Sequence, residues 1–160
     1  MIRPTVPEDT PELLSITQGT SLFLPADLQT LEEVLSDYHK ENAAQGHRCF
    51  TDEVNGKVIG FVYYAPAAMT DRTWYLWWIV VSKHTQARGV GGKLLKHAED
   101  AARADNGRLM MIDTSSLPTY DLTRRFYLKH GYEIAAVIKD FYADGHDLVM
   151  FRKRLSGNQP

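Results

Sequence analysis

The stretch from Trp74 to Ala104 limits the fold of this chain more than any other, because it has the pattern of a strand, a glycine-rich loop and a helix. Large, aromatic or β-branched side chains occupy positions 76–81, which favours a strand buried on both faces. Apolar residues then recur with helical spacing from Val90 to Ala102, which indicates a helix packed on a sheet. Glycines at such a junction leave backbone N–H groups uncovered at the positive end of the helix dipole. The pattern therefore predicts an anion site, most often one for phosphate.

The spacing of the glycines excludes two common phosphate loops. A mononucleotide loop needs Gly, four residues and then Gly-Lys-Ser/Thr, but Ala87 stands at its first position and Leu94 follows Gly92-Lys93. A dinucleotide loop, G-x-G-x-x-G, would begin at Gly89 and meets Leu94 where the third glycine is needed. The segment fits neither nucleotide class. A glycine-rich turn that only caps the helix is the alternative to another kind of phosphate site.

The composition is that of an ordinary globular domain. The 160 residues are 44% hydrophobic and 24% charged, and 18 basic against 20 acidic residues give a net charge of −2. This length predicts one domain, 1–155, followed by a disordered tail at 156–160. The charge argues against a nucleic-acid partner, and no apolar stretch has the length of a membrane span or the form of a signal peptide. With Cys49 as the single cysteine, we expect a cytoplasmic protein with no disulfide and no metal site.

Turn residues and apolar periodicity divide the rest of the chain into elements. Asn55-Gly56 and Asp144-Gly145 are hairpin signals, and Thr5 with Glu8 has the pattern of a helix capping box. Strands are expected at 1–5, 48–54, 57–64, 74–81, 108–114, 132–139 and 146–154, and helices at 5–18, 28–44, 90–105 and 119–130. The order β-α-α-β-β-β-α-β-α-β-β predicts an α/β (α+β) fold. It consists of a single mixed, mostly antiparallel sheet of about seven strands with helices on both faces.

Three motifs make this order specific. The glycine loop has the sequence Gln86-x-x-Gly89-x-Gly91, positions 126–132 have Phe-Tyr-x-Lys-x-Gly-Tyr, and Ile2-Arg3-Pro4 precedes Glu8-Asp9. On these elements and in this order, the motifs resemble those of the GNAT N-acetyltransferase superfamily along nearly the full length of the chain. The resemblance implies the GNAT fold and acetyl-CoA as cofactor. It also implies direct transfer of an acetyl group, in a ternary complex, to a primary amine of a small molecule, amino acid or peptide.

The same resemblance implies a cofactor site. In the family, amides of the loop hold the pyrophosphate of acetyl-CoA, and the pantetheine arm pairs with backbone of the strand before the loop. That backbone is 79–81 in this chain, and an N–H there is the family's usual oxyanion donor. The cofactor-binding residues so implied are Ile79, Val80, Val81, Gln86, Ala87, Arg88, Gly89, Val90, Gly91, Gly92, Lys93 and Tyr127.

The catalytic groups are less uniform. Tyr127 is the candidate general acid for the departing thiolate, because a tyrosine pKa of ~10 and a thiol pKa of ~8.5 suit proton transfer; a core aromatic is the alternative. Many family members carry a carboxylate where this chain has Tyr75. Asp113, His84 or an ordered water is therefore the candidate base, and Tyr75 itself is a further candidate catalytic residue. Asp113 could instead cap the polar loop that follows it, and His84 could simply be solvated.

The acceptor cleft is expected between the loop that joins the first two helices and the last hairpin. Its candidate substrate-binding residues are Phe23, Tyr64, Trp77 and Tyr142, with Leu24 and Phe141 beside them and Asp27, Asp140 and Asp144 able to attract a cation. Aromatic and acidic side chains suit a small amine, although loop acids are usually solvated. Two alternatives stay open: an acyl-CoA-binding sensor or interaction module on the same fold, and an unrelated α/β domain that binds another phosphate. Homodimers are common on this fold.

Overall fold

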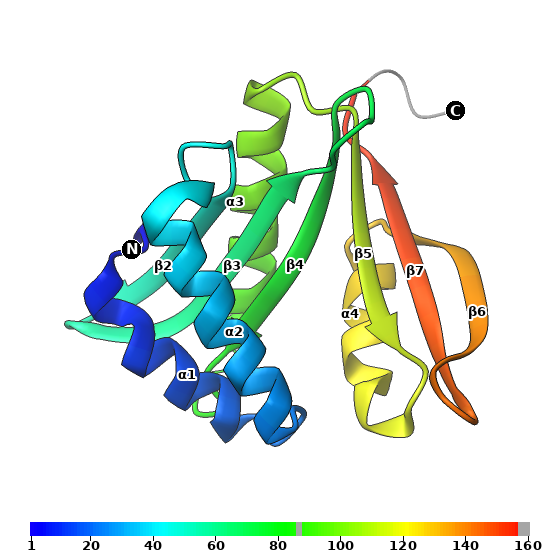
Figure 1. The fold of residues 1–160 in the computed structure, drawn as a ribbon, viewed down its shortest axis with the longest axis horizontal. Coiled ribbons are helices and arrows are strands. Elements are labelled where there is room, and N and C mark those ends of the chain that lie inside the picture. Colours follow the sequence, from blue (N-terminus) through cyan, green and yellow to red (C-terminus); the bar gives the residue numbers. More distant parts are fainter. Residues whose placement is uncertain (86–87, 157–160) are drawn as a thin grey trace. The chain divides into compact units, whose positions relative to one another are not determined.

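The computed structural model describes residues 1–85 and 88–156 (Figure 1). Its elements are β1 (Ile2–Pro4), η1 (Pro7–Asp9), α1 (Thr10–Gly19), α2 (Pro25–Asp37), η2 (Tyr38–Asn42), β2 (Arg48–Val54), β3 (Lys57–Pro66), β4 (Thr73–Val81), α3 (Val90–Ala104), β5 (Leu109–Ser115), η4 (Pro118–Tyr120), α4 (Asp121–Lys129), β6 (Glu133–Ala143) and β7 (His146–Arg154). The expected order of strands and helices is confirmed. Short 3-10 and π turns, the η elements, occupy the ends of three of the expected helices: η1 at the start of 5–18, η2 at the end of 28–44 and η4 at the start of 119–130. The disordered tail expected from 156 lies outside the described residues from position 157 onward.

The described strands form one seven-stranded sheet in the order β1-β2-β3-β4-β5-β7-β6. Strand β4 pairs in parallel with β5, whereas β1–β2, β2–β3, β5–β7 and β6–β7 are antiparallel pairs. The mixed, mostly antiparallel sheet expected from the sequence is therefore confirmed. The chain forms two compact units. The first consists of residues 1–66 and 78–98, and the second consists of residues 67–77 and those from 99 onward. Strand β4 and helix α3 contribute residues to both units.

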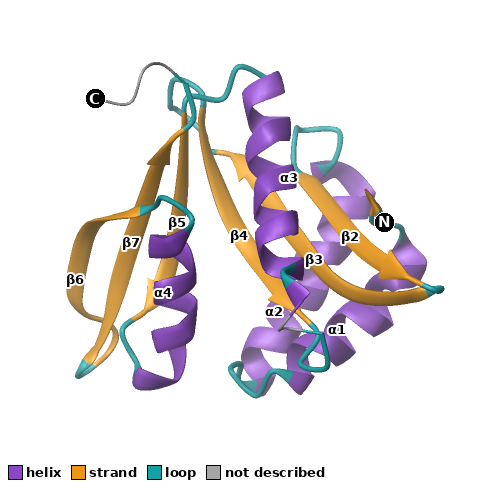
Figure 2. Ribbon diagram, turned by 180° about the vertical axis from the view of Figure 1, so that it is seen from behind, coloured by secondary structure: helices purple, strands orange, loops and turns teal. Residues whose placement is uncertain are grey.

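In the first unit, β3 is buried on both faces and organises the packing. Its residues at positions 61, 63 and 65 share a core with Leu13 of α1 and Leu31 of α2. Gly60 points the other way, and a β-carbon added there would meet a Leu94 side-chain atom of α3 at 3.0 Å. Because side chains alternate along a strand, α1 and α2 cover one face of β3 and the start of α3 covers the other (Figures 1 and 2).

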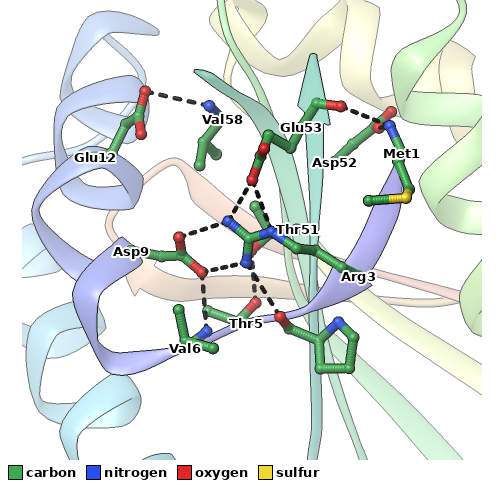
Figure 3. A network of polar contacts seen from close by, with 11 residues as sticks. Met1, Arg3, Thr5, Val6, Asp9, Glu12, Thr51, Asp52, Glu53 and Val58 are labelled. Atoms are coloured by element: carbon green, nitrogen blue, oxygen red, sulfur yellow. Dashed lines mark hydrogen bonds and ion pairs between the residues drawn. The ribbon is translucent and has the colours of Figure 1, made fainter. Parts of the chain in front are cut away.

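A polar network fixes the first turns of the chain to β2 (Figure 3). The guanidinium of Arg3 donates two hydrogen bonds of 2.8 Å to the Asp9 carboxylate, which also accepts the Val6 backbone N–H at 2.9 Å. The capping box expected at Thr5 is therefore wrong, since Asp9 caps this turn. The Thr5 hydroxyl instead forms a buried hydrogen bond of 2.6 Å with Thr51 of β2. Because the Thr5 hydroxyl bonds to β2, it does not cap the helix, and the local sequence spacing cannot reveal this long-range contact.

In the second unit, α4 packs on one face of β7. The ring of Tyr127 lies 5.4 Å from that of Phe151, between ring centroids. A buried polar cluster joins this helix end to α3: the Tyr132 hydroxyl donates to Glu99 at 3.0 Å, and Lys153 donates to the same carboxylate at 2.9 Å. The end of α4 is therefore held by an ion pair and a phenol as well as by apolar packing.

Strand β6 is the outer strand of the sheet and is exposed along its whole length. It runs to Ala143, beyond the expected end at 139, but its register with β7 shifts between Ile138 and Ala143. Asp140 has a φ of 57° in this bulge, and its backbone N–H donates to the Asp147 carboxylate at 3.0 Å. A bulge of this kind limits pairing with another strand and redirects the side chains that follow it.

Candidate active site

The glycine loop lies between β4 and α3 in the first unit. The Ser82 backbone N–H donates to Ile59 of β3 at 2.8 Å, and the Arg88 N–H donates to Thr85 at 3.1 Å. Gly89 has a φ of 73°, and its carbonyl accepts the first helical N–H, that of Lys93, at 3.1 Å. The expected cofactor residues Gln86 and Ala87 lie outside the described residues.

The surroundings of this loop fit an anion. Among the described residues, no atom would lie within 4 Å of a β-carbon added at Gly89, so they leave the space on this side of the loop open. The neighbouring Arg88 is exposed, and the fifteen-residue helix α3 begins at the next position, Val90. Uncovered N–H groups at the start of a helix of this length attract phosphate. The ammonium of Lys93 forms an ion pair with Asp52 of β2 at 2.7 Å, so in this structure its charge is directed to that carboxylate and not to the loop.

The strand before the loop is only partly buried. Val80 is buried, whereas Ile79 and Val81 are half-buried and Trp77 is 48% exposed. The expectation of a strand buried on both faces is therefore wrong at Trp77. The parallel register of β4 with β5 runs from Thr73 to Leu76, and β4 continues for five residues to Val81.

Tyr127 lies on α4 in the second unit and is 4% exposed. Its ring is surrounded by other rings, with centroid distances of 5.5 Å to Phe126, 5.9 Å to Tyr132 and 5.4 Å to Phe151. Burial raises the pKa of the Tyr127 phenol. The phenol therefore stays protonated at neutral pH, as a general acid must, but it is a weaker proton donor than an ordinary tyrosine. Such burial is also typical of a core aromatic.

The candidate catalytic residue Tyr75 and the candidate base Asp113 are neighbours in the second unit. The Tyr75 hydroxyl donates to Asp113 Oδ1 at 3.4 Å. The Asp113 carboxyl reaches solvent, yet the surrounding protein raises its pKa by partial burial, against the lowering effect of the Tyr75 hydrogen bond. Burial and then the charge of Asp113 raise the pKa of Tyr142 as well, which puts that phenol in the same electrostatic environment. The sequence offered these residues separately, and the fold brings them together.

Asp113 and Tyr127 belong to opposite faces of the second unit's strands. Ile112 is opposite Phe151 in the β5–β7 register, and Asp113 is opposite Met150. Since Tyr127 packs on Phe151, it lies on the face of Ile112. Alternation along β5 directs Asp113 to the other face. A proton acceptor and a proton donor are thus available on the two sides of these strands.

Sequence reasoning missed a pair beside this group. His146 Nε2 lies 2.6 Å from Ser115 Oγ, and the His146 ring lies 4.7 Å from the ring of Tyr142, between centroids. Arg124 of α4 donates to the Ser115 carbonyl at 2.6 Å. The pair depends on the register of β5 with β7 and on the bulge of β6, so no local pattern in the sequence could indicate it.

The expected acceptor residues differ in their exposure. Trp77 and Tyr142 are 48% and 47% exposed, and Phe23 is half-buried with its ring 5.4 Å from that of Trp78. Tyr64 is fully buried and stacks on Phe50, with 6.4 Å between centroids. It is therefore a core residue, and lining an open cleft is not its role in this structure. His84 is exposed in the turn after β4.

Within residues 1–85 and 88–156, no three His, Cys, Asp or Glu side chains are grouped as metal ligands. No helix there is long and apolar enough to cross a membrane.

Known proteins resemble this chain in sequence and in fold. A family model described as the acetyltransferase (GNAT) family matches residues 14–132. A structure described as an acetyltransferase of the GNAT family from Desulfovibrio desulfuricans is 29% identical, with a TM-score of 0.94 over 98% of this chain and 99% of that one. No curated protein sequence matches.

Two more distant structures share the fold alone. A ribosomal-protein-alanine N-acetyltransferase from Brucella melitensis is 18% identical, with a TM-score of 0.75 over 96% of this chain and 99% of that one. An aminoglycoside 6′-N-acetyltransferase complexed with coenzyme A is 14% identical, with a TM-score of 0.77 over 100% and 99% of the two chains. The fold of this chain has therefore been observed with coenzyme A bound.

Proposed function

Because the chain belongs to the GNAT family of acetyltransferases, we propose that it moves an acetyl group directly from acetyl-CoA to a primary amine of a small molecule, an amino acid or a peptide. Acetyl-CoA is the acyl donor of the family and supplies the activated thioester. The relatives named above act on a protein alanine and on an aminoglycoside. Both acceptors carry amines, which supports an amine acceptor without choosing among them. We take 1–155 to act as a single domain, since β4 and α3 run through both units.

The cofactor would be held at the start of α3. Backbone N–H groups from Arg88 to Lys93, together with those of Gln86 and Ala87, are the proposed partners of the pyrophosphate. The open space beside Gly89 supports this assignment. Backbone at 79–81 is the proposed partner of the pantetheine arm, and the strand that carries it continues past the last residue paired with β5.

Asp113 is the proposed base, and its hydrogen bond with Tyr75 supports the assignment. A base works best when its pKa lies near the working pH, and the raised pKa of Asp113 moves this carboxyl in that direction. Tyr75 holds one carboxylate oxygen, which leaves the other free to accept a proton from the amine. Tyr127, whose phenol burial keeps protonated, is the proposed donor to the leaving thiolate.

The acceptor would lie against exposed aromatic side chains. Trp77 and Tyr142 are each about half exposed, and Phe141 packs edge-on against Tyr142 with 4.9 Å between centroids. Phe23 and Leu24, in the loop between α1 and α2, are further candidates. Aromatic faces attract a protonated amine before it binds, and Asp113 then takes the proton.

The test is an assay for free thiol with acetyl-CoA and a broad panel of primary amines. Tyr127→Phe should lower kcat by about 100-fold, the usual size of one acid–base contribution, with little change in KM for acetyl-CoA. Tyr120→Phe, on the turn before α4, is the matched control and should retain wild-type turnover. Thermal stabilisation by acetyl-CoA without thiol release for any amine would favour the sensor. No stabilisation at saturating acetyl-CoA would exclude both readings.

A further inference from the structure

Lys93 occupies an unusual place for a cation. It is the fourth residue of α3, at the positive end of the helix dipole, where a lysine is unfavourable unless an anion compensates it. The compensating anion is Asp52 of β2, whose Oδ2 lies 2.7 Å from the Lys93 ammonium. The Asp52 side chain is 0% exposed, whereas that of Lys93 is 53% exposed. The fixed member of the pair is therefore the carboxylate.

Asp52 stays ionised in this buried place. Burial raises its pKa, but the hydrogen bonds and charges of Lys93 and of the α-amino group lower it by more than burial raises it. The pKa of Asp52 is therefore below its usual value. The α-amino group of Met1 lies 2.9 Å from Oδ1, so each carboxylate oxygen has its own cation (Figure 3 shows Met1 beside Asp52). Removal of either cation would leave charge on this buried carboxylate uncompensated, which would destabilise the folded protein.

The same turn of α3 also touches the sheet directly. Asp52 is opposite Gly60 of β3 in the register. A β-carbon at Gly60 would meet the Val80 carbonyl oxygen at 2.9 Å and a Val90 methyl at 3.3 Å. Gly60 therefore sets how closely α3 approaches the sheet, and the Asp52–Lys93 pair sets where along the sheet its first turn lies.

We propose that Asp52 is a positioning residue for the cofactor site: through Lys93 it fixes the first turn of α3, and so the direction of the N–H groups that receive the pyrophosphate. Lys93 then contributes to the cofactor site through its backbone N–H group, whereas its ammonium is bound to Asp52 and anchors the helix. This inference rests on the proposed cofactor site. It differs from the ordinary alternative, in which Lys93 binds phosphate by its charge.

The two alternatives predict opposite effects of one substitution. If Lys93 is an anchor, Asp52→Asn and Lys93→Met should each weaken coenzyme A binding about tenfold, a loss of ~1.4 kcal/mol. The double variant should be no weaker than the weaker single variant, because both changes break one interaction. If Lys93 is a phosphate ligand, Asp52→Asn releases its ammonium, and binding should stay unchanged or tighten. Isothermal titration with coenzyme A measures these affinities.

A donor without pyrophosphate separates positioning from general damage. With acetyl-pantetheine, kcat/KM should be unchanged in both single variants, whereas KM for acetyl-CoA should rise and kcat should stay within about twofold. Lys93→Arg should restore most of the affinity. Lys96→Met, which removes another exposed lysine of α3, is the control and should bind as the wild type does.

The outcomes that overturn the inference are distinct. Unchanged or tighter binding by Asp52→Asn would make Lys93 a phosphate ligand. An equal loss of kcat/KM with acetyl-pantetheine would make the pair only a stabilising contact. If Asp52→Asn folds poorly, the salt dependence of coenzyme A binding by Lys93→Met decides instead. It should equal that of the wild type if Lys93 is an anchor, and it should be weaker if the Lys93 ammonium binds phosphate. If the wild type itself binds no coenzyme A, the proposed cofactor site is wrong. That result is obtained before any variant is measured, so it is distinct from a failure of the positioning role.

Discussion

Two aspartates, one in each unit of the molecule, have opposite electrostatic surroundings. Asp52 is fully buried in the first unit, and two cations lower its pKa. Asp113 reaches solvent in the second unit, where partial burial raises its pKa and a tyrosine hydroxyl is its hydrogen-bond donor. A paired carboxylate contributes to stability, whereas a carboxylate without a cation is ready to accept a proton. Their surroundings therefore separate a structural role from a chemical one.

Removal of the paired carboxylate should have the largest effect. Asp52→Ala leaves Lys93 and the α-amino group without their anion, and the free energy of unfolding should fall by about 3 kcal/mol, as when other buried pairs are broken. Because the folded-state pKa of Asp52 is lowered, its contribution to stability is present above the unfolded-state pKa and is lost as the pH falls through the folded-state pKa. Urea unfolding of wild type and variant at several pH values measures both effects. Stability curves that stay parallel down to acidic pH would contradict this role.

Asp113, which has no cation beside it in the described part of the chain, should behave in the opposite way. Asp113→Asn should lower kcat about 100-fold, because it removes the proposed base. Its folded-state pKa is raised, so the charged form opposes folding at neutral pH, and the neutral amide should leave the Tm unchanged or raise it. Asp105→Asn, which changes an exposed carboxylate just after α3, is the control and should change neither quantity. A large fall in Tm with no fall in kcat would make Asp113 a structural residue like Asp52.

The sequence predicts the strands that carry both aspartates better than it predicts the side chains that contact them. Alternating apolar residues and turn signals such as Asn55-Gly56, where both φ values are positive, were enough to predict β2 with its observed bounds. The partners of Asp52 come from α3 and from the start of the chain, 41 and 51 positions away. Such contacts follow from register and helix placement, and no local pattern contains them.

The site shows the same limit. Spacing predicts a phosphate-type loop before α3 and leaves a glycine-rich helix cap as the alternative; the helix expected after the loop begins at Val90. The pairing of Tyr75 with Asp113 could not be predicted, because it depends on the parallel register of β4 with β5. Tyr64 looked like an acceptor residue because aromatic side chains suit amines. Alternation along β3 places it on the same face as Gly60, which α3 covers, so its side chain is buried.

A smaller effect tests the anchor of α3 without a change of charge. Gly60→Ala would put a methyl group 2.9 Å from the Val80 carbonyl oxygen, so the first turn of α3 must move. We expect a loss of about 2 kcal/mol in stability, typical of overpacking, together with weaker coenzyme A binding. Gly19→Ala, where an added β-carbon meets nothing within 4 Å, is the matched control. Calorimetry and titration would show whether stability and affinity fall together. A stability loss with normal affinity would uncouple the position of α3 from the cofactor.

The smallest expected effect concerns Tyr75, which tunes the carboxylate of Asp113. Its hydroxyl stabilises the ionised form of Asp113 and thereby lowers a pKa that burial raises. Tyr75→Phe removes this hydrogen bond, so the pKa of Asp113 should rise further. A base works when it is deprotonated, and the acidic limb of the kcat/KM profile should therefore move to higher pH. The plateau at alkaline pH should stay within about fivefold of wild type, since one such bond contributes about 1 kcal/mol. A fall of the plateau with an unmoved limb would mean that Tyr75 handles the proton itself, and Asp113 would then lose its place as the base.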